Sequence, residues 1–125
     1  MTSIRHEDLP IHHFPGFRHQ TVAGRHVGGA PVEVWHQVAE PGATTPRHHH
    51  DCDEVVVLLR GRARCTIGDL TEVVEAPATI LLPGGQDHEL TFLGPEPSEC
   101  IAVFSGTPAP VYAPDGSRVP VPWDA

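Results

Sequence analysis

Turn-forming residues divide this chain into short segments. Its 125 residues include 14 prolines and 12 glycines, and Pro-Gly pairs recur at 15–16, 41–42 and 83–84. Proline cannot continue a helix, because it lacks the backbone N–H and its ring clashes with the preceding turn. No apolar pattern at helical spacing runs far enough between these breaks. The chain is therefore predicted to consist of strands and turns, without a long helix.

Apolar alternation locates the strands. Residues 32–38 alternate valine with other residues, and residues 55–59 form an apolar, largely β-branched run that Gly61 ends. Both patterns are typical of strands. Further strands are expected at 18–27, 62–67, 72–75, 79–82, 89–92 and 99–104. Many short strands separated by turns predict an all-β fold, either a sandwich or a jelly-roll β-barrel.

Length and turns also predict the domain organisation. At 13.5 kDa the chain has the size of one domain, since domains commonly have ~100–150 residues. We expect residues 1–125 to form a single domain with three parts. These parts are an irregular N-terminal arm at 1–16, a barrel at 17–105, and a proline-rich segment at 106–125 that wraps the surface.

Charge and cysteine content exclude several partners. Eight basic residues face sixteen acidic ones, for a net charge of −8, and an acidic chain without a basic patch is a poor match for nucleic acid or an anionic membrane. No apolar run is long enough for a transmembrane helix, and the first residues contain no apolar signal core. The three cysteines form no CxxC pair, which suits reduced thiols. These features predict a cytoplasmic protein.

Four residues form a candidate metal site. His48 and His50 are two apart, and Glu54 follows four residues later, so a continuous strand would place all three side chains on one face. His88 follows a tight turn at 83–85 and can return across a barrel. Three imidazoles and a carboxylate would hold one divalent ion and leave two positions open. Zinc, manganese, iron, cobalt and nickel all accept this ligand set. The alternative is that the histidine-rich segment is only a solvated loop.

The spacing around these residues resembles the cupin superfamily, whose members have a jelly-roll fold. The first cupin motif is complete, and its residues are Gly42, His48, His50, Glu54 and Gly61. The second motif is partly present, as Pro83, Gly85 and His88, with Pro77 and Phe92 replacing its outer glycine and asparagine. The resemblance implies that three histidines and the glutamate bind the metal.

Within the cupins, the chain resembles the plant auxin-binding proteins. The similarity covers residues 33–105 and includes the segments 34–37, 41–42, 45–46 and 58–61. It implies zinc as the metal and an indole acid whose carboxylate binds the metal. The pocket residues of that family correspond to Trp35, Gln37, Thr45 and Pro46. The chain departs from the family in lacking its disulfide cysteines.

The C-terminal region matches this family only partly. Pro122–Trp123–Asp124 is similar to the C-terminal end of the family. The family also has a C-terminal tryptophan that covers the ligand, and residues 112–116 show no counterpart of it. We therefore expect the region to match the family at its end and to lack the covering residue.

The residues allow two orientations of the Trp35 side chain and three functions of the protein. A flat aromatic wall at Trp35 and an amide at Gln37 suit a small-molecule pocket, yet the periodicity of Val32, Val34 and Val38 would instead point Trp35 outward, into the interface of a homodimer. The preferred function is metal-dependent binding of a small, aromatic or indole, carboxylate. The alternatives are a cupin enzyme acting on a small organic acid, as a dioxygenase or as a lyase, isomerase or cyclase, and a metal-storage or sensor protein.

Overall fold

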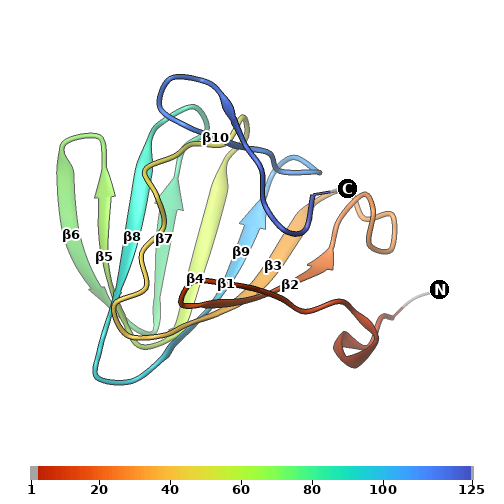
Figure 1. The fold of residues 1–125 in the computed structure, drawn as a ribbon, viewed down its shortest axis with the longest axis horizontal. Coiled ribbons are helices and arrows are strands. Elements are labelled where there is room, and N and C mark those ends of the chain that lie inside the picture. Colours follow the sequence, from red (N-terminus) through yellow and green to blue (C-terminus); the bar gives the residue numbers. More distant parts are fainter. Residues whose placement is uncertain (1–2, 125) are drawn as a thin grey trace.

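Two antiparallel β-sheets face each other in the computed structural model, which describes residues 3–124 (Figure 1). The larger sheet contains, in spatial order, β1 (His12–Phe14), β2 (Phe17–Ala23), β3 (Glu33–Ala39), β9 (Ser98–Phe104), β4 (Glu54–Arg60) and β7 (Ala78–Leu82). The smaller sheet contains β6 (Leu70–Glu75), β5 (Arg62–Ile67) and β8 (His88–Leu93). Within the described residues there is no α-helix, and the predicted all-β jelly roll is confirmed.

Short elements complete the chain at both ends. The sequence predicts an irregular N-terminal arm at 1–16, but the described part of this arm contains a 3-10 turn, η1 (His6–Asp8), and strand β1, which pairs with β2. Near the C-terminus, β10 (Val111–Tyr112) pairs with β11 (Arg118–Val119). Figure 1 shows this last part of the chain, in dark blue, crossing one open end of the sandwich. No helix in the described residues is long and apolar enough to span a membrane.

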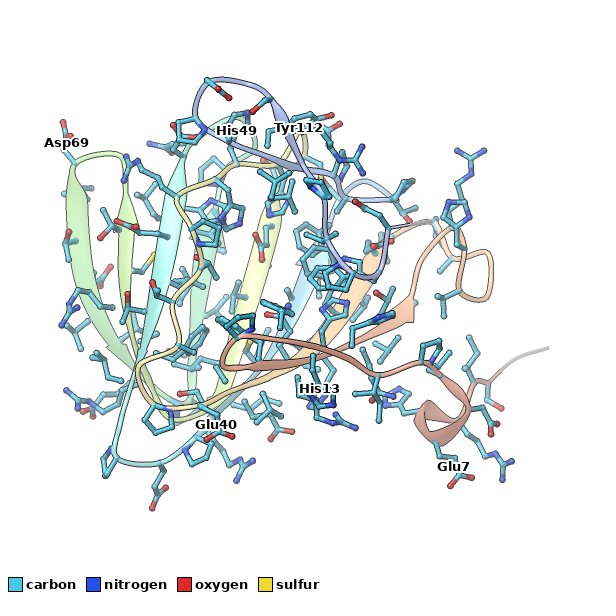
Figure 2. The ribbon with its side chains drawn as sticks, viewed as in Figure 1. Glu7, His13, Glu40, His49, Asp69 and Tyr112 are labelled. Carbon is cyan, nitrogen blue, oxygen red and sulfur yellow. The ribbon has the colours of Figure 1, made fainter. Side chains whose placement is uncertain are left out.

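The core lies between the sheets, where β2, β3, β4, β5, β7, β8 and β9 each bury side chains. In β9 every second residue is buried, and Leu58, Phe92 and Phe104 are among the largest fully buried side chains. The charged side chains of Glu7, Glu40 and Asp69 lie at the periphery (Figure 2). This alternation is the expected result of an apolar inner face and a solvated outer one.

Strand β3 shows that its valines do not mark the core. Trp35 is only 5% exposed and faces the inside, whereas Val34 and Val38 lie half-buried on the outer face and Val32 is exposed before the strand begins. The outward orientation of Trp35 that the periodicity allowed is therefore wrong. Both faces of β3 carry bulky residues, so alternation alone could not identify the inner one.

The segment between β3 and β4 crosses from one sheet to the other. His48 forms an isolated bridge with His88 of the smaller sheet, and His49 one with Tyr112, while Glu54 pairs with Leu82 of the larger sheet. A bend at 51–52 separates the two parts. The interpretation that one continuous strand carries His48, His50 and Glu54 on a single face is therefore wrong. His48 and Glu54 face each other from opposite sheets, because the chain changes sheets between them.

The last residue of the first motif, Gly61, must be glycine for a steric reason. Gly61 has a positive φ of 93°, and a Cβ there would collide with the side chain of Ser98. Glycine populates this backbone region without the penalty that other residues suffer. Position 61 thus turns the chain from β4 into β5 close against Ser98 of β9.

Candidate metal centre

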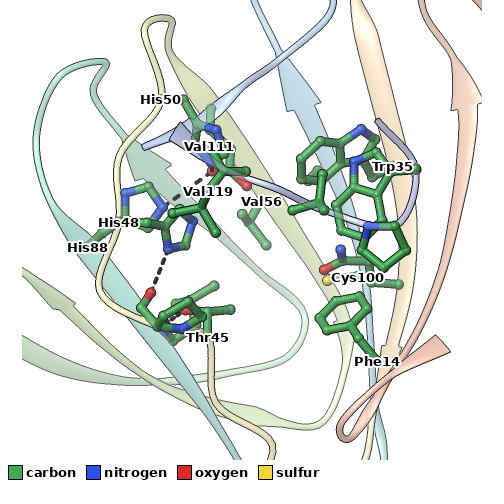
Figure 3. Close-up of a pocket in the computed structure, with 18 of the residues that line it drawn as sticks. Phe14, Trp35, Thr45, His48, His50, Val56, His88, Cys100, Val111 and Val119 are labelled. Atoms are coloured by element: carbon green, nitrogen blue, oxygen red, sulfur yellow. Dashed lines mark hydrogen bonds and ion pairs between the residues drawn. The ribbon is translucent and has the colours of Figure 1, made fainter. Parts of the chain in front are cut away.

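Three histidines from two distant segments of the chain meet between the sheets. One nitrogen from each of His48, His50 and His88 lies within 4.8 Å of the others, and all three side chains are buried. His48 and His50 come from the crossing segment, and His88 begins β8. Figure 3 shows their rings gathered on one side of the pocket. The structure therefore brings together the three histidines that the sequence predicted.

Each of the three rings is oriented by a backbone carbonyl oxygen. A carbonyl oxygen only accepts hydrogen bonds, so the Nδ1 atom that faces it must carry the ring hydrogen. The pairs are His48 with Pro46 at 2.6 Å, His50 with Pro110 at 2.9 Å, and His88 with Gln86 at 3.3 Å. A neutral ring protonated at Nδ1 has its lone pair on Nε2. All three rings thus offer the form in which imidazole binds a metal.

Glu54 supplies the fourth candidate ligand. Its Oε1 atom lies 3.3 Å from Nε2 of His50 and 3.5 Å from Nε2 of His88. This oxygen is buried and has no hydrogen-bond partner among the described residues. An unpartnered buried carboxylate oxygen is costly, and here it faces nitrogen lone pairs. A divalent cation bound by all of these atoms would satisfy them, so the residues fit a metal ion.

Burial lowers the pKa of His48 and His88 and so keeps both rings neutral. Desolvation is the largest cause that lowers the pKa of His88 from its ordinary 6.5 to about 4. Desolvation also lowers the pKa of His48, and neighbouring His50 adds to this effect. Metal ions bind neutral imidazole and compete with protons for it. The site therefore holds His48 and His88 in the metal-binding form at neutral pH.

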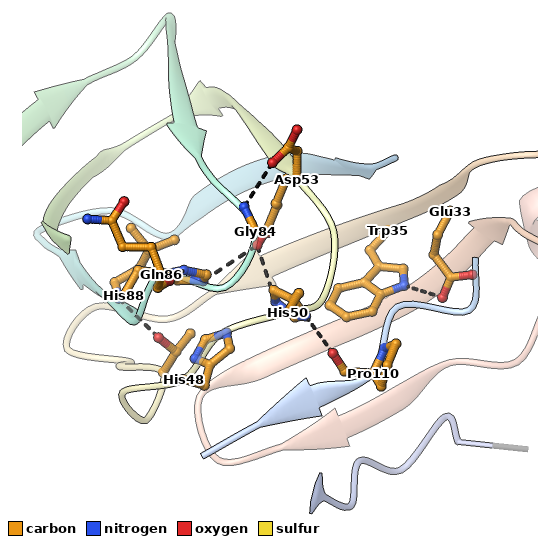
Figure 4. Close-up of polar contacts among 12 residues, drawn as sticks. Glu33, Trp35, His48, His50, Asp53, Gly84, Gln86, His88 and Pro110 are labelled. Atoms are coloured by element: carbon orange, nitrogen blue, oxygen red, sulfur yellow. Dashed lines mark hydrogen bonds and ion pairs between the residues drawn. The ribbon is translucent and has the colours of Figure 1, made fainter. Parts of the chain in front are cut away.

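A loop contact fixes the position of the second motif. The backbone N–H of Gly85 donates to the carbonyl of His50 at 2.8 Å, and that of Gly84 donates to the carboxylate of Asp53, also at 2.8 Å. Figure 4 shows the turn before His88 lying against the segment that carries His50. A Cβ at position 84 would meet the Cys52 backbone at 2.8 Å, so only glycine permits this approach.

The metal centre opens into an apolar cavity of about 240 Å³. Its walls include the four predicted ligand-pocket residues, Trp35, Gln37, Thr45 and Pro46. Further apolar walls come from Phe14, Val56, Leu90 and Phe92. The structure therefore places the predicted metal and pocket residues around one cavity, and the role of the latter in binding a ligand stays a prediction.

A buried carboxylate orients the aromatic wall. The indole Nε1–H of Trp35 donates to Glu33 Oε2 at 2.9 Å (Figure 4). The other oxygen of Glu33 accepts a hydrogen bond of 2.8 Å from the Thr107 hydroxyl. The indole donor of Trp35 thus points away from the cavity. Trp35 offers only apolar surface to a ligand.

Sequence reasoning missed the part of the pocket that the C-terminal segment builds. Val111, Val119, Val121 and Trp123 all line the cavity. Trp123 stacks on His19, with ring centroids 3.5 Å apart and planes 9° apart. The expectation that no C-terminal tryptophan covers the pocket is therefore wrong for Trp123. Its similarity to the end of the family was the available signal, but proline-rich segments have no periodicity that shows which face turns inward.

Comparison with known proteins agrees with this geometry. The family described as Auxin binding protein matches residues 4–83. Auxin-binding protein 1 of Arabidopsis thaliana is 32% identical over 117 residues, which are 84% of this chain and 59% of that protein. Auxin-binding protein 5 of Zea mays is 44% identical over 54 residues, 42% of this chain and 36% of that protein. The chain thus spans less than two thirds of the length of either relative.

Solved structures share the fold. An RmlC-like cupin from Shewanella frigidimarina superposes with a TM-score of 0.73 at 17% identity and covers 86% of this chain and 93% of that one. The polyketide cyclase RemF from Streptomyces resistomycificus also has a TM-score of 0.73, at 19% identity, and covers 99% of this chain and 89% of that one. Since the family match covers more than half of the chain, this protein is a metal-binding cupin that belongs to the auxin-binding protein family.

Proposed function

We propose that this protein binds a small aromatic or indole carboxylate, with the carboxylate on a divalent metal held by His48, His50, His88 and Glu54. The observation that carries the proposal is the opening of this ligand set into the apolar cavity. A divalent ion with one glutamate and neutral histidines has a local charge of about +1. That charge attracts a single carboxylate, and the apolar walls accept the body that carries it.

The size and walls of the cavity support a bicyclic aromatic body. An apolar cavity of roughly 150 Å³ admits benzene, and this one measures about 240 Å³. Trp35 and Phe92 offer flat apolar surface. The names of the relatives, auxin-binding proteins, agree with an indole acid such as indole-3-acetate.

Thr45 and Pro46 complete the proposed carboxylate end. The backbone N–H of Leu90 donates to the Thr45 hydroxyl oxygen at 3.0 Å. The hydroxyl hydrogen of Thr45 is then free to donate to a ligand oxygen. Pro46 lies two residues before His48 and accepts its Nδ1 hydrogen, so it shapes the cavity wall directly beside the metal.

Zinc is the metal we propose. It binds imidazole nitrogen and carboxylate oxygen and has no redox chemistry, which suits a binding protein. Manganese, iron, cobalt or nickel would fit the same donors. When bound, the metal supplies a positive centre for the ligand carboxylate. The backbone carbonyl groups of the chain orient the histidine rings that hold the metal.

Binding is favoured over proton-transfer catalysis by the lining of the cavity. Apart from the proposed metal ligands, Cys100 is the titratable side chain among the described lining residues. Burial raises the pKa of the Cys100 thiol to about 12. A general base needs a pKa near the working pH, and this thiol is far from it. An enzyme of this fold acting on a small organic acid remains the second candidate, and the experiment below separates the two.

A homodimer and a cytoplasmic location belong to the proposal. Val34, Val103, Val55 and Leu81 are cross-strand neighbours on the outer face of four adjacent strands, and Leu81 is 66% exposed. A continuous apolar row of this kind is suited to covering by a second copy. The three cysteines are free, which supports a reducing compartment.

The test is an NMR titration of zinc-loaded and iron-loaded protein with indole-3-acetate, followed over hours in air. Saturable binding with an unchanged ligand supports the proposal. Conversion of the ligand would replace it with an enzymatic function. Absence of binding to both metal forms would refute it.

A further inference from the structure

Gln37 lies at the end of the cavity away from the metal centre. It pairs with Cys100 on β9, whereas Glu54 pairs with Phe104 on the other side of the same strand. These two β9 residues are four apart, which is about 13 Å along a strand. Gln37 and the metal ligands nevertheless line the same cavity. A ligand that bridges them needs one polar group at each end.

His19 holds the amide of Gln37 in one orientation. The Gln37 amide nitrogen donates to Nδ1 of His19 at 3.0 Å, and Nε2 of His19 donates to the Thr21 hydroxyl at 2.9 Å. A neutral histidine has one donor and one acceptor, and His19 uses both. Its ring is fully buried and stacked on Trp123. His19 therefore has no freedom to release the amide.

The carbonyl oxygen of Gln37 is left for a ligand. It accepts no hydrogen bond from any residue in the range 3–124, and it is not among the buried atoms that lack a partner, a condition found for Glu54 Oε1. Gln37 Oε1 is thus not fully enclosed, and Gln37 is one of the residues that line the cavity. Nearby Trp35 has no polar atom to offer, because Glu33 takes its N–H. The ring end of the cavity presents a hydrogen-bond acceptor in apolar surroundings.

We infer that the site selects aromatic acids with an N–H or O–H donor on the ring system, opposite the carboxylate, and that His19 is the positioning residue for this selection. The inference rests on the proposed function and specifies its ligand class. A ring without the donor would displace water from Gln37 Oε1 without replacing the hydrogen bond that the water made. Such a mismatch weakens binding by about tenfold.

The test compares two acids of the same shape on the zinc-loaded full chain. Indole-3-acetate carries the ring N–H, and benzofuran-3-acetate has an oxygen in its place. By calorimetry, the benzofuran acid is expected to bind about tenfold more weakly. Gln37→Leu should bring the two affinities together. His19→Phe keeps an aromatic ring beside Trp123 but removes the acceptor for Gln37, so it should narrow the ratio while metal content stays that of the wild type.

The outcomes separate this inference from the function on which it rests. Equal affinities in the wild type, or a preference for benzofuran-3-acetate, would overturn the donor selection and leave carboxylate binding intact. An unchanged ratio in Gln37→Leu would assign the selection to another residue and overturn the inference as well. If neither acid binds the wild type, the proposed function and the inference are both wrong. The comparison on the wild type stands even if a variant fails to fold.

Discussion

Glu54 Oε1 lies 3.3 Å from Nε2 of His50, although neither atom has a hydrogen to share. The hydrogen of His50 is on Nδ1, where it is donated to the carbonyl of Pro110. A buried carboxylate oxygen is therefore opposed by a nitrogen lone pair. A cation bound between the two atoms would explain why they face each other. Replacing Glu54 should therefore have opposite effects on the stability of the metal-free and the zinc-loaded protein.

Glu54→Gln is expected to stabilise the metal-free protein and to abolish the stabilisation by zinc. The amide can donate to Nε2 of His50 or His88, which removes the unpartnered buried oxygen and raises the free energy of unfolding by about 1–3 kcal/mol. Thermal unfolding with chelator and with excess zinc measures both effects. Glu40→Gln, at an exposed position, is the control. A zinc-dependent rise in Tm equal to that of the wild type would show that Glu54 is not a ligand.

The free energy of unfolding is expected to decrease as the pH is lowered, because His19 is buried in its neutral form. Burial is the main cause that lowers the pKa of His19 to about 3, helped by His12 and His36. At a pH between the ordinary pKa of 6.5 and this value, the His19 imidazole is protonated in the unfolded chain and neutral in the folded chain. The free energy of unfolding therefore decreases as the pH falls, by up to ~1.4 kcal/mol per pH unit.

Urea unfolding of chelated protein at about pH 7 and about pH 5 measures this effect. The wild type should lose roughly 2 kcal/mol more than His19→Phe over that interval. His26→Phe, at an exposed position, should follow the wild type. Parallel pH dependence of the wild type and His19→Phe would contradict the burial of a neutral His19.

Trp123→Ala is expected to weaken the binding of indole-3-acetate while leaving metal content unchanged. The indole closes one side of the cavity and lies far along the chain from the proposed ligands. Loss of its stack on His19 should also lower stability by about 1 kcal/mol. Trp123→Phe should retain part of the affinity. Calorimetry measures the affinity for indole-3-acetate, and metal analysis of the same samples measures the metal content. Unchanged affinity in Trp123→Ala would show that the C-terminal segment does not contribute to ligand binding.

Val103→Arg is expected to convert a dimer into a monomer. Val103 is at the centre of the outer apolar row, between Val34 and Val55, and a charge there cannot be buried against a second copy without a partner. Light scattering gives the mass, and Val73→Arg on the outside of the other sheet, where Val73 is 52% exposed, is the matched control. A wild type that stays monomeric at high concentration would contradict the proposed interface.

The sequence predicts which residues meet better than it predicts the path of the chain through them. Motif spacing named His48, His50, Glu54 and His88 and required no knowledge of the strands. A single continuous strand face does not explain the spacing, because the bend at 51–52 moves the chain between sheets. Spacing records which residues meet, but a local periodicity argument cannot detect a change of sheet.

The pocket walls show where sequence reasoning stops. The family resemblance predicts that Trp35 lines the cavity, while the valines of β3 favour the opposite face. Trp123 was missed because it reaches the cavity from the end of an irregular segment, held by His19. Contacts of this kind depend on tertiary packing between distant segments. No pattern within ten or so residues encodes them.

Metal stoichiometry is the measurement that tests the account most directly. The full chain is loaded with zinc, freed of excess metal by desalting, and analysed by elemental mass spectrometry beside His50→Ala and His88→Ala. Circular dichroism verifies that each variant is folded. We predict about one zinc ion per chain in the wild type and substantial loss in both variants, because each removes a nitrogen ligand. Zinc-free wild type, or stoichiometric zinc in both variants, would contradict the proposed metal centre.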